Sequence, residues 1–138
     1  MNHTLRRFSV VAILVAVMTG CAGLGRDAKV NISSLDPKEQ VSSLASARWN
    51  ALIAGDLAKA YEYLSPGTRS TMSLEIYKAK IRTGSWKKAT VDSISCEQEI
   101  CKVTMVIDHS YKSLQSIETP LFEDWLQENG RWWFVPRK

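Results

Sequence analysis

The chain has 138 residues, with 18 Lys and Arg against 14 Asp and Glu, and a formal net charge of +4. Its length fits one ordinary domain, and an apolar share of 45% is enough for one core. These values exclude a multidomain protein, a disordered tail and a polytopic membrane protein. Arg6 and Arg7 supply half of the net charge, so the remaining 118 residues are nearly balanced, which argues against nucleic acid as a partner.

The amino terminus has the layout of a secretory signal. Arg6 and Arg7 precede an apolar run, Phe8–Met18, and Thr19-Gly20 then lead to a cysteine. The run is too short to cross the roughly 30 Å hydrocarbon core of a bilayer. We therefore expect a cleaved signal peptide over residues 1–20 and not a transmembrane anchor.

Met18-Thr19-Gly20-Cys21 resembles the bacterial lipobox, whose usual form is Leu-Ala/Ser-Gly/Ala-Cys; Met stands here in place of Leu. The resemblance implies cleavage before Cys21 and acyl chains on its sulfur and nitrogen, which hold a protein stably at a membrane. Ala22 follows the cysteine, whereas Asp is the residue known to retain such lipoproteins at the inner membrane. The resemblance thus implies the periplasmic face of the outer membrane of a Gram-negative bacterium.

Residues 21–35 show no sustained period and are expected to form a lipidated tether before a single domain at 36–138. Asp36-Pro37-Lys38-Glu39 is typical of a helix start, with an N-cap acid, Pro at the first position and an acid three residues after the cap. A stripe of mostly apolar side chains then predicts a helix that ends at Gly55. Its members are Val41, Leu44, Ala45, Arg48, Trp49, Leu52 and Ile53.

Two shorter helices are predicted next. Asp56 can cap a helix over 57–64, which Ser65-Pro66-Gly67 is expected to end. Ser73 is expected to begin a third helix that continues to about Ile81.

Cys96 and Cys101 lie between two segments rich in Val, Ile, Thr and Ser, which predict two strands. A turn at Gln98-Glu99 would place the two cysteines directly opposite each other, within disulfide range. Export permits a disulfide, so we expect one here. A metal site or a redox pair is disfavoured, because His109 is the only histidine beyond the signal and the spacing is not Cys-x-x-Cys.

A second hairpin is predicted at Asn129-Gly130, the strongest short hairpin signal, after a polar connection near 110–116. In this register Leu126 lies opposite Trp133 and Trp125 opposite Phe134. The order of helices followed by strands predicts an α+β fold, with three N-terminal helices packed on a curved antiparallel sheet of about four strands.

The segments Ala47–Leu52, Gly55-Asp56 and Ala60–Pro66 resemble the opening helices of nuclear-transport-factor-2-like (NTF2-like) domains, and Asn129–Val135 resembles their last strand. The resemblance implies a cystatin-like cone, in which helices close the hollow side of a curved sheet and often leave an apolar pocket. It transfers no activity, because the superfamily contains isomerases, dehydratases, transport adaptors and binding-only members.

Catalytic members of that superfamily use a carboxylate base opposite a tyrosine or an acid. The candidates here are Tyr61 on the second helix and Asp108 and Asp124 on strands, and burial of Asp124 with its apolar neighbours would raise its pKa. His109 adjoins Asp108, but adjacent strand residues point to opposite faces. No catalytic constellation, cofactor or metal is therefore expected.

Aromatic side chains are expected to line a pocket or an interface, because consecutive Trp132 and Trp133 put large apolar groups on both faces of the last strand. The set is Trp49, Tyr61, Trp125, Trp132, Trp133 and Phe134. An apolar outer face indicates a second subunit or an envelope protein as partner, unless another segment of the chain covers it. A basic group on the third helix and first strand, Lys78 to Lys88, is expected to be solvated.

Together these patterns favour a non-enzymatic envelope lipoprotein that binds a partner protein or a small apolar ligand. The alternative is a small pocket enzyme of the isomerase or dehydratase kind.

Overall fold

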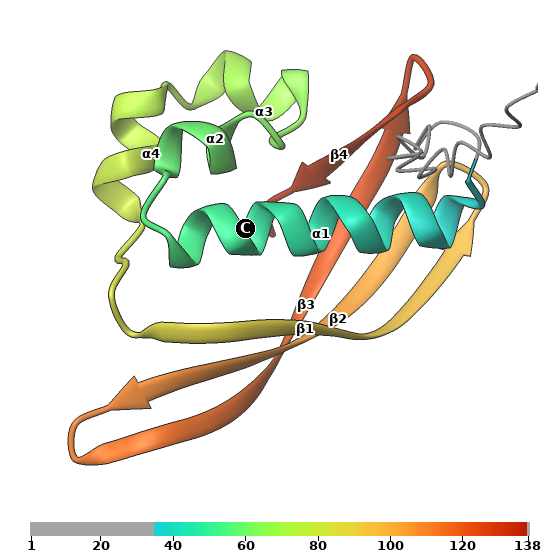
Figure 1. Ribbon diagram of the computed structural model, residues 1–138. Coiled ribbons are helices and arrows are strands. Elements are labelled where there is room, and N and C mark those ends of the chain that lie inside the picture. The colour runs from blue at the N-terminus through green and yellow to red at the C-terminus, as the bar shows by residue number, and fades with distance from the viewer. Residues whose placement is uncertain (1–34, 138) are drawn as a thin grey trace, which may run out of the picture. The chain divides into compact units, whose positions relative to one another are not determined.

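In the computed structural model, residues 35–137 are described; the expected signal peptide, Cys21 and almost all of the tether lie outside this part of the chain. The described residues form an α+β domain with helices first and strands after them (Figure 1). The helices are α1 (Pro37–Ile53), α2 (Leu57–Tyr61), α3 (Pro66–Thr71) and α4 (Leu74–Lys80). The strands are β1 (Trp86–Glu97), β2 (Ile100–Tyr111), β3 (Leu114–Glu128) and β4 (Arg131–Val135).

Helix starts follow the expected capping chemistry. The Asp36 carboxylate accepts a hydrogen bond from the Lys38 backbone N–H at 3.1 Å, and Asp56 accepts one from Lys59 at 3.1 Å. Ser73 caps α4 through the backbone N–H of Ile76. Side-chain acceptors satisfy N–H groups that have no partner within a helix, so each cap defines where its helix begins.

The expectation of three helices is wrong in number, because Ser65-Pro66-Gly67 starts a helix instead of only ending one. The Ser65 hydroxyl accepts a hydrogen bond from the Thr68 backbone N–H at 3.1 Å, and Pro66 occupies the first turn of α3. Proline needs no N–H partner in that turn and has a φ suited to a helix. The preceding helix α2 ends earlier than expected, at Tyr61.

The four strands form one antiparallel sheet in the order β1-β2-β3-β4. The cystine hairpin has the expected register near its turn, where Cys96 pairs with Cys101 and the two are joined by a disulfide. Register shifts at Trp86/Lys88 and Val91/Ser93 move the pairing by one residue farther along β1. The second hairpin pairs Leu126 with Trp133 as predicted, and Asn129 and Gly130 both have positive φ, as a tight hairpin turn requires.

The polar connection expected near 110–116 is instead the tip of a long hairpin. Strand β2 runs to Tyr111 and β3 begins at Leu114, so only two residues form the turn. Nearly all side chains from Tyr111 to Thr119 are exposed, and the hairpin extends away from the helices (Figure 1). Ladder pairing, with one register shift between His109 and Tyr111, sustains these strands without a core beneath them, and hydropathy alone does not reveal such pairing.

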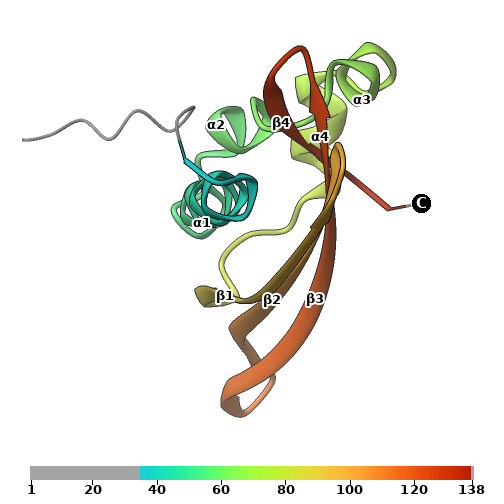
Figure 2. The same cartoon turned by 90° about the vertical axis from the view of Figure 1, so that its right-hand side faces the viewer.

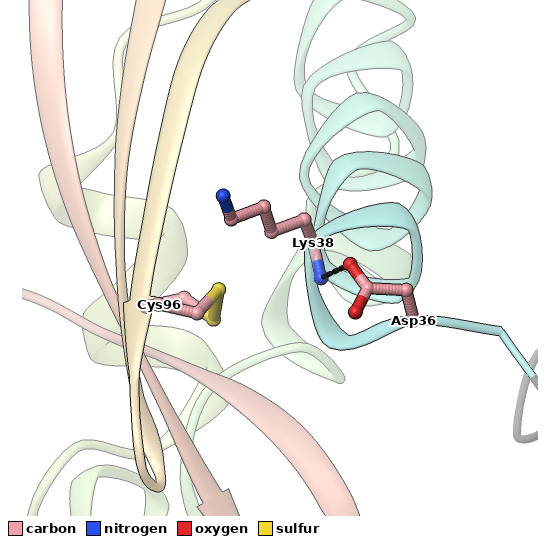
Figure 3. The surroundings of a disulfide bond; sticks show 4 residues. Asp36, Lys38 and Cys96 are labelled. Atoms are coloured by element: carbon pink, nitrogen blue, oxygen red, sulfur yellow. Dashed lines mark hydrogen bonds between the residues drawn. A yellow bond between two sulfur atoms is a disulfide. The ribbon is translucent and has the colours of Figure 1, made fainter.

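The sheet bends around α1, and all four helices lie toward one side or one end of it (Figure 2). Alternation along the strands divides the sheet into an inner face, toward the helices, and an outer face. The core lies between α1 and the inner face and includes Val41, Trp49, Leu52, Met105 and Trp125. Cys96 is on the inner face, beside the first turn of α1 (Figure 3).

Candidate functional site

A buried ion pair links α1 to the inner face of the sheet. Nη1 of Arg48 lies 2.7 Å from Oε1 of Glu123, and the two residues are only 5% and 1% exposed. Arg48 belongs to the buried stripe of α1, whereas Glu123 is on β3 at an inward position two residues before Trp125. Charges so far from water persist only when they are paired and hydrogen-bonded.

Two tryptophans complete the hydrogen bonding of the Glu123 carboxylate. The indole N–H of Trp49 donates to Oε1 at 2.7 Å, and that of Trp125 donates to Oε2 at 3.0 Å. The Arg48 guanidinium also lies 3.6 Å from the ring centre of Phe134, a cation–π contact. Both oxygens of Glu123 are therefore occupied by donors from three residues, so this carboxylate orders the core and is not a free base.

A cavity of about 420 Å³ adjoins this ion pair, between α1, α4 and the region where β3 and β4 meet the C-terminal residues. Its wall is mostly apolar, with basic groups among the apolar ones. The lining residues are Arg48, Met72, Tyr77, Lys80, Ile81, Leu121, Phe122, Phe134, Pro136 and Arg137. This volume suits one small organic molecule.

Tyr77 is the one tyrosine of the cavity lining and is only 3% exposed, and its hydroxyl proton has no acceptor among the described residues. Burial raises the pKa of Tyr77 above its ordinary value of 10, while the nearby positive charge of Arg48 acts in the opposite direction. At neutral pH the hydroxyl is therefore protonated and able to donate.

A second, smaller cavity of about 150 Å³ lies farther along the inner face, and Leu121 lines both cavities. Trp49 and Trp86 line it in an edge-to-face pair with ring centres 5.3 Å apart. His109 is also at its wall, with Nε2 2.9 Å from the hydroxyl of Thr119. The neighbouring Asp108 is on the opposite face of β2, so these two residues form no acid–base pair.

Known proteins resemble this chain in structure but not detectably in sequence. No family model and no curated protein matches the sequence. A SEC-C motif containing protein from Rhodopseudomonas palustris aligns with a TM-score of 0.52 at 15% identity, over 64% of this chain and 70% of that one. A Campylobacter jejuni protein described as a "Putative NTF2-like transpeptidase" aligns with a TM-score of 0.53 at 14% identity, over 70% of this chain and 98% of that one. The chain has an NTF2-like fold.

The NTF2-like domain does not bring the candidate catalytic residues together. The hydroxyl of Tyr61 donates to the backbone oxygen of Met72 at 2.7 Å. Asp108 accepts a hydrogen bond from Ser116, and Asp124 forms a two-pronged ion pair with Arg137 at 2.7 and 2.9 Å. The hydrogen bonds from Arg137 lower the pKa of Asp124, so the rise that burial of this face would have caused does not occur: the carboxylate is paired on the outer face.

The aromatic candidates divide among three environments of the NTF2-like domain. Trp49 and Phe134 line the two cavities, whereas Trp125 and Trp132 are fully enclosed in the core. Trp133 is on the outer face but only 9% exposed, because cations cover its ring. Arg131 and Arg69 of α3 lie 4.1 and 5.2 Å from the centre of that ring.

Sequence reasoning missed three residues of the site: Glu123, Tyr77 and Arg48 as the partner of a buried acid. A signal for the ion pair was present, since a basic residue in the buried stripe of α1 and an acidic residue at an inward strand position both need a partner. Tyr77 had no such signal, because a tyrosine on an amphipathic helix is an ordinary core residue.

The described residues contain neither a cluster of metal ligands nor a helix that could span a membrane. Between residues 35 and 137, no group of three or more His, Cys, Asp or Glu side chains is arranged to hold a metal ion. Within the same range, no helix has the length and apolar character needed to cross a bilayer.

Proposed function

We propose that the protein is a lipid-anchored envelope protein whose NTF2-like domain binds a small ligand or partner without converting it chemically. The lipobox-like Met18–Cys21 supports the anchor, and Ala22 supports delivery to the outer membrane. The observation that carries the binding role is the occupied Glu123 carboxylate, which accepts hydrogen bonds from Arg48, Trp49 and Trp125 beside the cavity.

A pocket enzyme of the isomerase or dehydratase kind needs a free carboxylate or imidazole next to its substrate. The buried phenol of Tyr77 is the observation that favours this alternative, since it could polarise a carbonyl. The 420 Å³ cavity offers no base to act with it, because its lining contains neither an acid nor a histidine. The lining also contains no Ser, Thr or Cys, so this cavity has no side chain that could act as the nucleophile of a transpeptidase, the activity in the name of the Campylobacter jejuni neighbour.

Mass spectrometry of protein purified from membranes tests the anchor. We expect a mature chain that begins at an acylated Cys21, and a Cys21→Ser variant that leaves the membrane fraction. An unmodified chain that begins at Met1, or a Cys21→Ser variant that remains membrane-bound, would contradict it.

Native mass spectrometry of the same protein tests the binding role. We expect a co-purifying small molecule that is recovered unchanged after incubation with fresh protein. Chemical conversion of that molecule, slowed by Tyr77→Phe, would instead establish the enzyme.

A further inference from the structure

The cavity of about 420 Å³ combines an apolar wall with an excess of positive charge. Its ionisable lining residues are Arg48, Lys80, Arg137 and Tyr77, and none of them is an acid. Glu123 neutralises Arg48, and Asp124 neutralises Arg137. Among the described residues Lys80 has no ion-pair partner, so the mouth of the cavity has an uncompensated cation.

Two buried polar atoms of the lining residues have unused hydrogen-bonding capacity. Nε of Arg48 and the hydroxyl of Tyr77 are both enclosed; Arg48 lies close enough to Tyr77 to act on the phenol oxygen, but neither group has an acceptor for its proton among the described residues. A buried donor without an acceptor costs free energy, so such atoms are uncommon unless something else satisfies them. Here both belong to side chains at the wall of one cavity and both are donors at neutral pH.

The apolar part of the wall lies on the strand side. Leu121 and Phe122 line the cavity and are 38% and 57% exposed, so they offer apolar surface to an occupant. Phe134 is held beneath the Arg48 guanidinium. An occupant must therefore have an apolar body as well as a group that accepts hydrogen bonds.

We propose that this cavity binds a free organic anion with an apolar body, such as a medium-chain carboxylate. Arg48 and Tyr77 donate to the anionic group, Lys80 supplies the balancing charge, and Leu121 and Phe122 contact the apolar body. The proposal deepens the proposed function, since it gives the chemical class of the ligand. A cationic ligand is disfavoured by the uncompensated charge of Lys80, and a purely apolar one would leave both donors unsatisfied.

The test uses residues 22–138, without acyl chains. All buried apolar residues that the structure describes lie between Val41 and Trp133, so this chain retains that core and is expected to fold alone. The probe is 1-anilinonaphthalene-8-sulfonate, and the reference is N-phenyl-1-naphthylamine, which has the same aromatic body and no charge. We expect the anionic probe to bind at least tenfold more tightly, and octanoate to displace it where octan-1-ol does not.

The variants assign this preference to the cavity. Tyr77→Phe should weaken binding of the anionic probe about tenfold or more, the effect of losing one hydrogen bond to a charged group. Lys80→Gln, at an exposed position, should weaken it about two- to fivefold. Binding of the neutral probe should be unchanged. The controls are Tyr111→Phe, on the exposed β2–β3 tip, and Lys78→Gln, on α4 outside the cavity lining, and both should leave binding of either probe unchanged.

Equal affinities for the two probes, or unchanged anion binding in both cavity variants, would overturn the proposal. Sedimentation with phosphatidylglycerol vesicles tests whether the anion is a lipid headgroup instead of a free ligand. Vesicle binding that Lys80→Gln abolishes, together with a failure of octanoate to displace the anionic probe, would assign the cavity to a lipid headgroup. That result would overturn the proposal of a free ligand. These outcomes leave the acylation of Cys21 untouched, so failure here is distinguishable from failure of the anchor.

Discussion

At the residue scale, Arg48 and Glu123 are opposite charges placed at positions that the fold buries. The pair joins residues 75 positions apart and is enclosed by Trp49, Trp125 and Phe134. Such a pair contributes little net stability relative to apolar residues, but loss of one partner leaves an uncompensated charge in the core. It therefore fixes how α1 lies on β3 more than it adds to stability.

We expect Glu123→Gln to lower the free energy of unfolding by about 3–5 kcal/mol, because Arg48 would remain charged and buried. Urea denaturation of residues 22–138 measures this change. Glu118→Gln, at an exposed position on the same strand, should alter stability by no more than about 0.5 kcal/mol. A loss below about 1 kcal/mol for Glu123→Gln would mean that water reaches the pair.

Tyr77 predicts a dependence of stability on alkaline pH. Its folded pKa is raised above the unfolded value of about 10, mainly by burial. The folded state therefore retains the proton longer, so this contribution is complete below about pH 10 and is lost as pH rises through the folded pKa.

We expect Tyr77→Phe to make the loss of unfolding free energy above about pH 10 shallower than in the parent. Urea unfolding at a series of pH values measures it. The exposed Tyr111→Phe serves as the control and should reproduce the parent profile. Parallel curves for parent and Tyr77→Phe would show that the phenol is not desolvated.

At the element scale, sequence signals located helix starts better than helix ends. The caps at Asp36, Asp56 and Ser73 were predicted and are present. Helix α3 was missed because Ser-Pro both ends one helix and begins another, and short helices have almost no apolar period to detect. This short helix matters for the outer face, because α3 places Arg69 over the ring of Trp133 there.

The cystine hairpin was predictable in register because its turn and its covalent bond act within six residues. Closing this small loop stabilises the domain by about 2 kcal/mol on the chain-entropy account. We expect reductant to lower the unfolding free energy of residues 22–138 by about that amount. A Cys96→Ala, Cys101→Ala variant should not respond to reductant, and an unresponsive parent would indicate that the disulfide is not formed.

Both edges of the sheet carry features that disfavour pairing with a further strand. Strand β4 pairs only with the last part of β3, from Asp124 to Glu128, which leaves the earlier part of β3 without a neighbour on that side. Pro120 lies in that unpaired part and has no N–H to offer a further strand. At the other edge, β1 carries Lys87 and Lys88 beside a register shift, which also disfavours pairing.

At the scale of the whole molecule, the outer face of the sheet exposes less apolar surface than the aromatic residues on both faces of β4 had led us to expect. The chain covers Trp133 with its own α3 and Arg131, whereas Phe122 and Ile100 remain at least half exposed on that face. A partner on the outer face thus stays a prediction, with Ile100 as the exposed apolar residue it would bury.

The proposed anchor and localisation predict the effect of a single substitution next to Cys21. We expect Ala22→Asp to move the protein from outer-membrane to inner-membrane fractions of a Gram-negative host, while Ala22→Ser leaves it in place. Density-gradient fractionation with immunodetection measures the change. An Ala22→Asp protein that stays with the outer membrane would mean that this residue does not direct sorting.

What the sequence determined by itself was local: the order of helices before strands, three helix caps, two of the three hairpin turns, the cystine pair and the α+β class. Each depends on residues within a few positions of one another, where backbone geometry and side-chain chemistry act directly. Tertiary structure alone decided that Arg48 meets Glu123, that Tyr77 joins them at a cavity, and that Asp108 and Asp124 lie away from it. These outcomes depend on how the curved sheet places distant segments side by side, which no local pattern in the sequence encodes.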